Sequence, residues 1–470
     1  MSVASMSSSM SPHKHKKFFD VVVVGGGLVG ACVAAGLKQH RLTASLNVAL
    51  IDAAQLQGSS SSSLPSKVSL PPEPPLRVST VTPASRALLT AVGAWDILLN
   101  LQNDNTSSVA PFHAMKVWDA NNASINYTSQ DAFQAGAIPT PDEPMAHVVE
   151  NDALQQAMLQ VATNRGVHAL WPRKLTSLTL PKHDVPRSNE PAQLTLLDES
   201  TGKSETISTS LVVAADGQRS RTRQLAKLRY EGGPYRDQVG AVFTLALNEP
   251  IDTAYQKFLP TGPLALLPVR AALPSGAPRA NVVWSTTAAH AAELCSLDGD
   301  ALAAATNGAL EGGPAPRAIE AVGVARSFPL SMSMAPRMTA PRLVLAGDAA
   351  RAVHPLAGQG ANLGFADARA AVETIASCAR SGLDLGDGAS WQRYGDLRLA
   401  EGMAWSASLE LIRRAYASEA LSGARFMGVS VMDQVSPVKS LLVRVASGVS
   451  GAYGGALDDD EWGTAPMSRK

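Results

Sequence analysis

The residues best able to hold a ligand lie in a stretch from Pro341 to Arg380. There Asp348 follows the short apolar run Leu343–Leu345, and the glycine-rich turn Gly358–Gly360 precedes a helical pattern. A carboxylate at the end of a buried strand can accept hydrogen bonds from sugar hydroxyls, and the free N–H groups at a helix start favour an anionic or electron-rich group. We therefore expect a ligand cradle. The alternative is an ordinary strand, turn and helix with Asp348 on the surface.

A second glycine-rich turn lies near the N-terminus. Gly25, Gly27 and Gly30 form a GxGxxG pattern between the apolar run Phe19–Val24 and an alanine-rich helical pattern. In such a turn the first glycine permits the sharp bend, the second lets a pyrophosphate approach the backbone, and the third lets helix and strand pack closely. The next apolar run ends in Asp52, at about the distance where an acid meets a ribose hydroxyl. These residues predict a dinucleotide site, with NAD and FAD both open at this point.

Two further stretches carry polar groups that could reach the same ligand. Asp216 and Gly217 follow a buried apolar run, and basic residues follow them between positions 219 and 223. These basic residues could pair with Asp216 or reach a phosphate, and a plain Asp-Gly turn is the alternative. Arg77 precedes a helix expected over Pro83–Val92, where it could meet a phosphate or simply be solvated.

Composition limits the possible classes of function. The chain has 470 residues, 45% of them hydrophobic and 17% charged, which is typical of globular proteins with two or three domains. Forty basic residues balance forty acidic ones, so no nucleic-acid partner is expected. Cys32, Cys295 and Cys378 are too few and too far apart for a disulfide framework or a zinc site. We expect no metal and three buried thiols.

The elements that must position these residues predict an α/β fold. Helical patterns cover Pro83–Val92 and Asp152–Thr163, and a hairpin joins Gln193–Leu197 to Glu205–Thr209. Strand-like runs recur from Gln238 to Val283, which suggests a β-sheet substrate domain inserted into a Rossmann-like nucleotide-binding domain. The predicted parts are a nucleotide-binding domain over 18–105, 145–230 and 331–400, a substrate domain over 106–144 and 231–330, a helical region over 401–447, and tails over 1–17 and 448–470.

Three segments need their own interpretation. Residues 55–75 are rich in serine and proline, which predicts a flexible surface insertion. Residues 401–447 mix apolar and basic positions, so they could dock on a membrane or a partner, although we favour a helical layer packed on its own domain. The tail over 448–470 is expected to be disordered, and the tail over 1–17 to be disordered or a targeting segment.

Taken together, the three motifs resemble the single-component flavin hydroxylases, aromatic-ring monooxygenases with one FAD domain of the glutathione-reductase type. Within that group the chain is similar, from about Phe19 to about Leu442, to the ubiquinone (coenzyme Q) biosynthesis monooxygenases, above all the mitochondrial ring-C5 hydroxylases. The stretches that carry this closer resemblance are Gly93–Asp96, Val117–Ala120, Val149–Asp152, Lys257–Pro263, Ala265–Pro268 and Val283–Thr286.

The resemblance implies FAD as the cofactor and assigns a role to each motif. Asp348 would bind the ribityl chain, and the backbone N–H groups of Gly360–Asn362 would face the N1–C2 edge of the flavin. His354 is expected to be structural, and no catalytic base is assigned. The residues implied to bind the cofactor are Gly25, Gly27, Gly30, Asp52, Arg77, Asp216, Gly217, Asp348, Gly360, Ala361 and Asn362, with Pro355, Gly358 and Gln359 lining the flavin.

The implied reaction is hydroxylation of a polyprenylated phenol with O₂, through a flavin C4a-hydroperoxide. Electrons would come from NAD(P)H or from a ferredoxin-type protein. The resemblance also implies peripheral association with the matrix side of the mitochondrial inner membrane, or with a ubiquinone-biosynthesis complex. Two alternatives stay open, namely an FAD-dependent oxidoreductase without oxygen insertion and a non-catalytic binder of prenylated proteins with the same fold.

Overall fold

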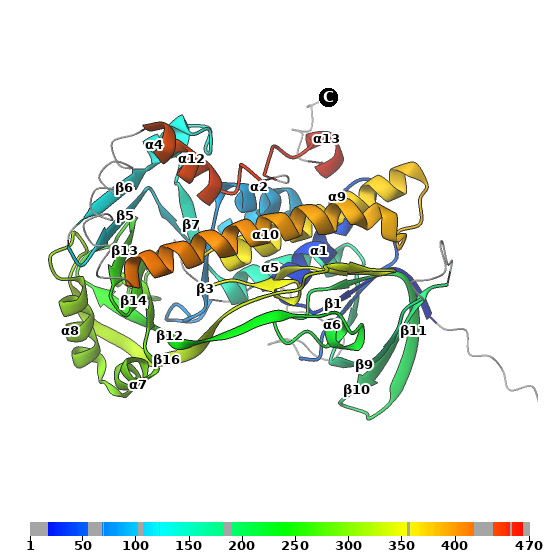
Figure 1. Ribbon diagram of the computed structural model, residues 1–470, viewed down its shortest axis with the longest axis horizontal. Coiled ribbons are helices and arrows are strands. Elements are labelled where there is room, and N and C mark those ends of the chain that lie inside the picture. The colour runs from blue at the N-terminus through cyan, green and yellow to red at the C-terminus, as the bar shows by residue number, and fades with distance from the viewer. Residues whose placement is uncertain are drawn as a thin grey trace, which may run out of the picture.

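A computed structural model describes residues 17–54, 68, 70–101, 107–121, 123–181, 190–354, 358–417, 436–451 and 454–463. Pro355, residues 55–67 and most of the predicted N-terminal tail therefore lie outside the described residues. Two large sheets lie at opposite ends of the molecule, and the long strands β12 (Glu231–Leu247) and β16 (Ala318–Met334) run between these ends (Figure 1). The α/β class that the sequence predicts is confirmed.

The first sheet is built around parallel strands. Its order is β17-β18-β11-β1-β2-β8, and the hairpin of β10 and β9 joins it through β11. Residues Val21 and Val23 of β1 face one core, while Val22 and Val24 face another, so the strand is buried on both sides. The strands are β1 (Lys17–Val24), β2 (Val48–Ile51), β8 (His168–Leu170), β9 (Arg173–Thr179), β10 (Ala192–Asp198), β11 (Ser204–Ala214), β17 (Thr339–Ala340) and β18 (Leu343–Leu345).

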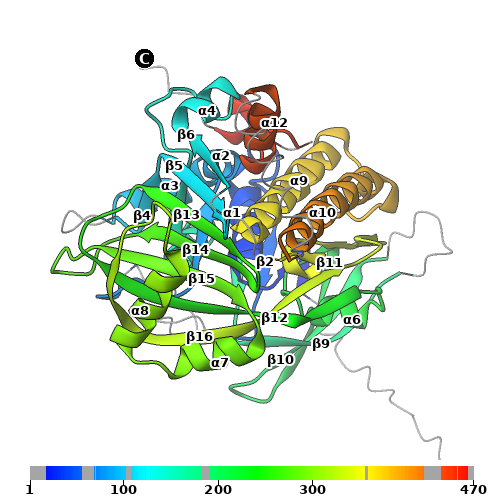
Figure 2. The same cartoon turned by 60° about the vertical axis from the view of Figure 1, so that its left-hand side comes forward.

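Helices cover the first sheet and make its larger core. Helix α1 (Leu28–Gln39) packs against α5 (Asn151–Asn164) and α9 (Gln359–Ser381), and apolar side chains from all three share one cluster with the sheet. Helix α10 (Gly388–Ala417) lies beside α9 (Figure 2). The remaining elements of this half are α2 (Pro83–Val92), α3 (Ala94–Leu99), α6 (Arg221–Leu225), η1 (Gly347–Ala349) and α13 (Asp459–Trp462).

The second sheet forms the predicted substrate half. Its order is β19-β16-β12-β15-β14-β13-β5-β6, and α7 (Ala288–Ser296) and α8 (Gly299–Leu310) supply side chains to its apolar core. A small sheet of β3 (Val78–Val81), β7 (Ala146–Glu150) and β4 (Val109–Phe112) contacts it through β14. The other elements are β5 (Ala114–Asp119), β6 (Ser124–Thr128), α4 (Ser129–Gln134), β13 (Thr253–Leu259), β14 (Gly262–Val269), β15 (Arg279–Thr286), β19 (Arg351–Ala352) and α12 (Ser436–Ala446).

The serine- and proline-rich segment corrects one expectation at its C-terminal end. Arg270 donates hydrogen bonds to the carbonyls of Pro71 (2.6 Å) and Pro72 (3.3 Å). Arg279 holds both oxygens of Glu73, at 2.8 and 2.9 Å. Residues 70–75 are thus fastened to the second sheet, so the prediction of a flexible insertion is wrong for them. Composition suggested a segment without a core of its own, but its backbone and one acid are bound by arginines from elsewhere.

The C-terminal tail corrects a second expectation. Trp462, in α13, is 1% exposed, and its ring packs edge-on against His40 at 5.0 Å between centroids. Arg369 of α9 donates to the carbonyl of Gly455 at 2.7 Å. The prediction of a disordered tail is therefore wrong for residues 454–463. The buried ring of Trp462 and the hydrogen bond from Arg369 hold this part of the tail on α1 and α9.

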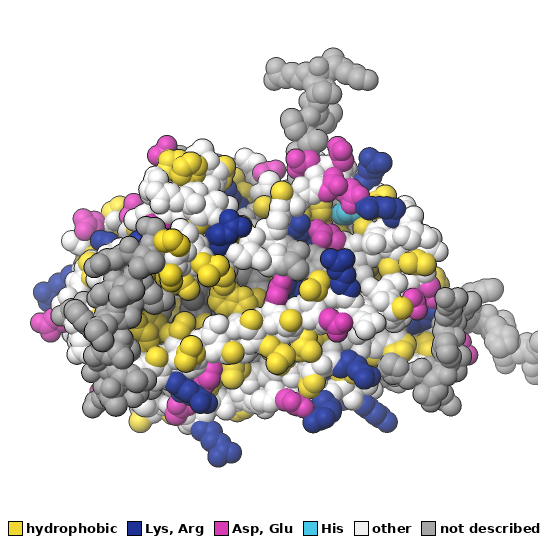
Figure 3. Space-filling view, turned by 45° about the horizontal axis from the view of Figure 1, so that its top comes forward, with side chains coloured by type: hydrophobic (Ala, Val, Ile, Leu, Met, Phe, Trp, Pro, Cys, Tyr) yellow, Lys and Arg dark blue, Asp and Glu magenta, His cyan; other side chains and the backbone are white. Residues whose placement is uncertain are grey.

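The C-terminal helical region also differs from its predicted outline. The boundary at residue 400 falls inside α10, which packs on α9 and also reaches β13 and β14 of the second sheet. The face that bears α10 and α12 shows many apolar side chains among scattered charges (Figure 3). The large exposed ones on these helices are Met403, Leu411, Val438, Leu441 and Val445. Within the described residues, no helix is both long and apolar enough to cross a membrane.

Candidate functional site

The predicted site residues gather at the carboxyl ends of the parallel strands of the first sheet. Strands β2, β1, β11 and β18 are neighbours and run parallel, so their carboxyl ends meet there. Asp52, Gly25, Asp216 and Asp348 each come within three residues of the end of one of these strands. In open α/β sheets this edge is where ligands bind. The fold thus brings together motifs that lie more than 300 residues apart.

The glycine-rich loop has the geometry that its pattern predicts. Gly25 has a φ of +104°, and a Cβ there would lie 2.4 Å from the carbonyl oxygen of Ala215. A Cβ on Gly30 would lie 1.8 Å from the carbonyl oxygen of Gly25. Neither position accepts a side chain. A Cβ on Gly27, in contrast, would meet no atom within 4 Å, so this part of the loop faces open space.

Two side chains from other elements hold this loop in place. The carboxylate of Asp52 accepts a hydrogen bond from the N–H of Gly26 at 2.6 Å, and Gln155 of α5 donates to the carbonyl of Gly26, also at 2.6 Å. Both peptide groups at Gly26 are therefore fixed before any ligand binds. Sequence reasoning missed Gln155, because nothing in its local pattern tells it apart from other helix residues.

The loop also packs directly against the third motif. A Cβ on Gly347 would lie 2.8 Å from Val29, and one on Gly364 would lie 2.5 Å from the same side chain. Only glycines at these two positions let Val29, which is part of GxGxxG, fit between η1 and α9. The first and third motifs are one packed unit.

Asp348 is exposed, but its carboxyl is partly shielded from water. Its side chain is solvent-accessible, yet the surrounding protein displaces enough water that desolvation raises the pKa of its carboxyl. The positive charges of Arg351 and Arg77 act in the opposite direction. Arg77, 271 positions earlier in the numbering, therefore lies within electrostatic range of Asp348.

Helix α9 packs against the turn that bears this acid. Gly358 precedes it in the left-handed conformation, with a φ of +63°, and a Cβ on Gly360 would meet no atom within 4 Å. Asn362 donates to the carbonyl of Thr80 at 2.8 Å and accepts from the N–H of Thr82 at 3.1 Å. Its side chain thus fixes the start of the helix on β3. The first backbone N–H groups of a helix have no partner within the helix itself.

The other flavin-lining positions have less open surroundings. Gln359 is buried, and its amide donates to the carbonyl of Ala446 in α12 at 3.3 Å. Ala361 is partly buried against the main core. His354 is 1% exposed, with one ring nitrogen 3.3 Å from the side-chain oxygen of Gln238. Burial lowers the pKa of His354 to about 4, so it is neutral at physiological pH and serves as a packed polar residue.

The second motif works differently from its predicted alternatives. Asp216 accepts from the hydroxyl of Ser220 at 2.5 Å and from the N–H of Thr222 at 2.9 Å, so it caps the start of α6. Arg223 does not form an ion pair with it but donates to the carbonyl of Ala349, at 2.7 Å. The expectation that these basic residues pair with Asp216 is therefore wrong for Arg223, which is bonded to backbone carbonyls instead. Gly217 does face open space.

The residues fit a flavin dinucleotide. Open positions at Gly27, Gly217 and Gly360 leave room for a bound group along the strand ends, and each belongs to a different motif. A helix N-terminus and an accessible acid, Asp348, flank this room. Such a cradle can hold a pyrophosphate at one end and an electron-rich ring at the other.

Comparison with known proteins agrees with this geometry. A family model described as "FAD binding domain" matches residues 77–387. The crystal structure of p-nitrophenol 4-monooxygenase PnpA from Pseudomonas putida shares the fold, with a TM-score of 0.68, 16% identity and coverage of 93% of this chain and 99% of that one. PqsL of Pseudomonas aeruginosa, described as a probable FAD-dependent monooxygenase, has a TM-score of 0.64, 18% identity and coverage of 88% and 99%. Fold and site define an FAD-dependent flavoprotein of the aromatic-hydroxylase type.

Sequence relatives narrow the family. The mitochondrial ubiquinone biosynthesis monooxygenase COQ6 of Homo sapiens is 32% identical over 91% of this chain and 92% of its own length. The protein of the same name from Dictyostelium discoideum is 26% identical over 92% of both chains. The chain belongs to the family of ubiquinone biosynthesis monooxygenases. It is an FAD-dependent monooxygenase, as its motifs predict.

Proposed function

We propose that this protein hydroxylates the aromatic ring of a polyprenylated phenol in ubiquinone biosynthesis, with FAD as its cofactor. The observation that carries the proposal is the packing of the glycine-rich loop against α9 and against the turn that bears Asp348, at the ends of adjacent parallel strands. Relatives that share this chain almost end to end are named for the same pathway. Bound FAD supplies the activation of O₂ and the transfer of one oxygen atom to the ring.

The chain's own residues hold and orient the cofactor. Gly25, Gly27 and Gly30 form the pyrophosphate turn, and Asp52 is placed for the adenosine ribose. Arg77 neutralises phosphate charge beside Asp348, whose carboxylate accepts hydrogen bonds from the ribityl chain. Asp216 and Gly217 follow β11, so they lie between the glycine-rich turn after β1 and Asp348 after β18. The N–H groups of Gly360, Ala361 and Asn362 would stabilise negative charge at the N1 edge of the ring, with Gly358 and Gln359 beside it, while Pro355 lies outside the described residues.

An apolar cluster beside the third motif supplies surroundings for the substrate. Phe258 of β13 stacks on Tyr416 of α10, with 3.8 Å between ring centroids and 14° between planes. Val353, next to His354, packs against the same cluster, as do Trp405 and Ile412 of α10. Apolar side chains of this kind suit a phenol ring with an apolar chain, and they would exclude water from the reacting ring.

The remaining partners follow from the reaction and from the surface. A monooxygenase needs O₂ and a reductant, which we propose is NAD(P)H or a ferredoxin-type protein. The exposed apolar side chains of α10 and α12 support peripheral attachment to a membrane or to a biosynthetic complex (Figure 3). Relatives named as mitochondrial support a mitochondrial location, and within it we propose the matrix side of the inner membrane.

Oxygen incorporation tests the activity. We expect the purified holoenzyme, supplied with a prenylated phenol, a reductant and ¹⁸O₂, to yield a product that carries one ¹⁸O atom on its ring. Each donor is tried separately, as NADH, NADPH or reduced ferredoxin. Hydrogen peroxide as the only oxygen product with every donor would refute the hydroxylase assignment.

Substitution of Asp348 tests the site. Loss of a charge-assisted contact of about 1.5–3 kcal/mol should weaken FAD binding by roughly 10- to 150-fold in Asp348→Ala. The matched control is Asp300→Ala, an exposed acid in α8 on the second sheet, which should leave FAD affinity unchanged. A shift of the apoprotein's denaturant midpoint with unchanged FAD affinity would mean that Asp348 has only a structural role.

A further inference from the structure

The short turn that bears Asp348 is held by side chains from three other elements. The carboxylate of Asp367 in α9 accepts from the N–H of Gly347 at 2.8 Å. The hydroxyl of Tyr230, just before β12, donates to the carbonyl of Asp348 at 3.1 Å. Arg223 of α6 donates to the carbonyl of Ala349 at 2.7 Å. A three-residue 3₁₀ turn has few internal hydrogen bonds, so these outside contacts determine its conformation.

Tyr230 and Arg223 act as one assembly. The guanidinium carbon of Arg223 lies 3.6 Å from the centroid of the Tyr230 ring, within the range of a cation–π contact. Arg223 is 4% exposed and also donates to the carbonyl of Gln218 at 2.8 Å, inside the second motif. Burial raises the pKa of Tyr230 to about 12, so its hydroxyl keeps its proton at any physiological pH. Tyr230 can therefore serve as a permanent donor.

The direction of the Asp348 side chain depends on this backbone. Within the described part of the chain, no hydrogen bond from protein to its carboxylate is found, although its main-chain carbonyl is bound. Its carboxylate is thus aimed by the turn rather than by contacts of its own.

We propose that Tyr230 is a positioning residue for the cofactor. Its hydroxyl fixes the peptide that follows Asp348, so that the carboxylate points towards the ribityl chain. This inference rests on the proposed function, because it requires Asp348 to contact that chain. The second motif then serves the cofactor indirectly, since Asp216 caps the helix that carries Arg223, and Arg223 supports the Tyr230 ring.

A double-mutant cycle with Tyr230→Phe and Asp348→Ala tests the proposal. Tyr230→Phe keeps the ring over Arg223 and removes only the hydroxyl. We expect FAD to bind the Tyr230→Phe apoprotein about 2- to 12-fold more weakly, the range for one hydrogen bond. In the Asp348→Ala background, the same change should have no further effect, because the group that Tyr230 positions is gone. FAD affinity is measured by quenching of flavin fluorescence as apoprotein is titrated in.

The controls separate positioning from general stability. Tyr255→Phe alters a buried tyrosine that packs against Trp118 in the second sheet, and it should leave FAD affinity unchanged. Arg223→Lys keeps a charge but removes the flat surface under Tyr230, so it should weaken FAD in the same coupled way. Denaturant midpoints of each apoprotein show that affinity is compared between folded samples.

Each failure has a distinct meaning. If Asp348→Ala leaves FAD affinity unchanged, both the proposed cofactor site and the inference are wrong. If Asp348→Ala weakens FAD but Tyr230→Phe does not, the site stands and the positioning role is refuted. Equal losses from Tyr230→Phe in both backgrounds would also refute it, because Tyr230 would then act independently of Asp348.

Discussion

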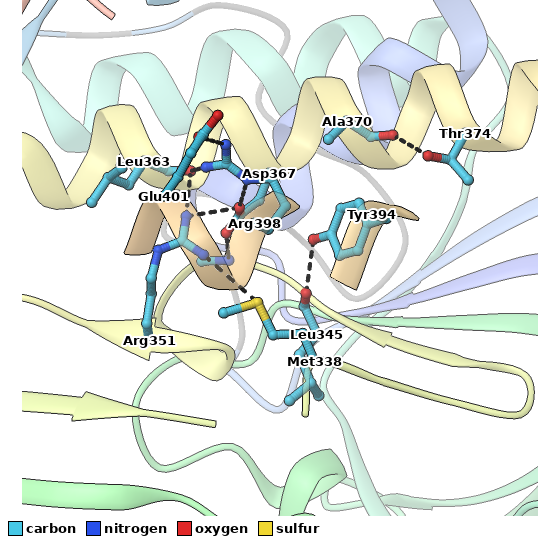
Figure 4. Close-up of polar contacts among 11 residues, drawn as sticks. Met338, Leu345, Arg351, Leu363, Asp367, Ala370, Thr374, Tyr394, Arg398 and Glu401 are labelled. Carbon is cyan, nitrogen blue, oxygen red and sulfur yellow. Dashed lines mark hydrogen bonds and ion pairs between the residues drawn. The ribbon is translucent and has the colours of Figure 1, made fainter. Parts of the chain in front are cut away.

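The buried ion pairs behind the turn that bears Asp348 lead to a prediction about Asp367. Its carboxylate is wholly buried and accepts from Arg351 at 2.8 Å and from Arg398 at 2.6 Å (Figure 4). It also receives the N–H of Gly347. One acid thus links β19, α9, α10 and the turn that bears Asp348. We expect Asp367→Asn to destabilise the apoprotein strongly.

The magnitude follows from what the two arginines retain. Arg398 keeps its ion pair with Glu401 and a hydrogen bond to the carbonyl of Leu363. Among the described residues, Arg351 keeps a 3.3 Å contact to that carbonyl, a 3.9 Å contact to the sulfur of Met338 and the more distant negative charge of Asp348. Removing one partner of a buried ion pair costs about 3–5 kcal/mol.

The same pair makes a prediction about acid. Burial alone would raise the pKa of Asp367, but Arg351 and Arg398 outweigh it and hold the pKa of this carboxyl below its ordinary value. A carboxylate with a depressed folded pKa contributes stability that is fully present above its unfolded pKa of about 3.9. That stability is lost as pH falls through the folded pKa. Asp367→Asn should therefore flatten the stability loss of the wild type below about pH 4.

Urea titration of FAD-free protein measures the effect, since bound FAD would add its own stabilisation. Glu199→Gln is the control, because Glu199 pairs with Lys174 in the open, where such a pair is worth less than about 1 kcal/mol. Asp367→Leu combined with Arg351→Met should recover part of the loss, since an apolar replacement removes the stranded charge. A loss below about 1 kcal/mol in Asp367→Asn would refute the reasoning.

Two further predictions concern the glycine loop and the tail. Gly30→Ala should destabilise the apoprotein, because its Cβ would lie 1.8 Å from the carbonyl oxygen of Gly25, whereas Gly27→Ala should leave the fold intact and weaken FAD binding. Urea midpoints and FAD titrations of both variants distinguish the two effects. A normal urea midpoint for Gly30→Ala would contradict the packing. Trp462→Ala should cost about 3–5 kcal/mol, as for other large buried aromatic residues, because it empties the site beside His40; an unchanged midpoint would show that the tail does not contribute to stability.

Local sequence patterns predicted the strand and helices around the site. The strand over Phe19–Val24 and the alanine-rich helix after the glycine turn are predicted from composition and glycine spacing, and both are confirmed by β1 and α1. The predicted helix over Pro83–Val92 is confirmed to the residue, with Gly93 ending it in the left-handed conformation. Each of these features depends on residues close together in the chain.

Residues that act across long separations could not be predicted in this way. Gln155, Tyr230 and Asp367 all contact loops of the cradle, but each lies in a helix or beside a strand whose local pattern is ordinary. Their roles depend on which elements become neighbours in space. The same limit explains the tail, where acidic composition suggested disorder although Trp462 offered an apolar anchor.

The two acids that follow buried strands show why similar motifs do different work. Asp216 and Asp348 both follow a parallel strand of the first sheet and lie beside a glycine. After Asp216, the chain supplies Ser220 and Thr222, whose hydroxyls and N–H group turn back to satisfy the carboxylate. After Asp348, the chain continues through alanines and Arg351, and that arginine pairs with Asp367 instead. At these two strand ends, the residues that follow decide whether the protein itself satisfies the carboxylate, and this difference can be read from the sequence.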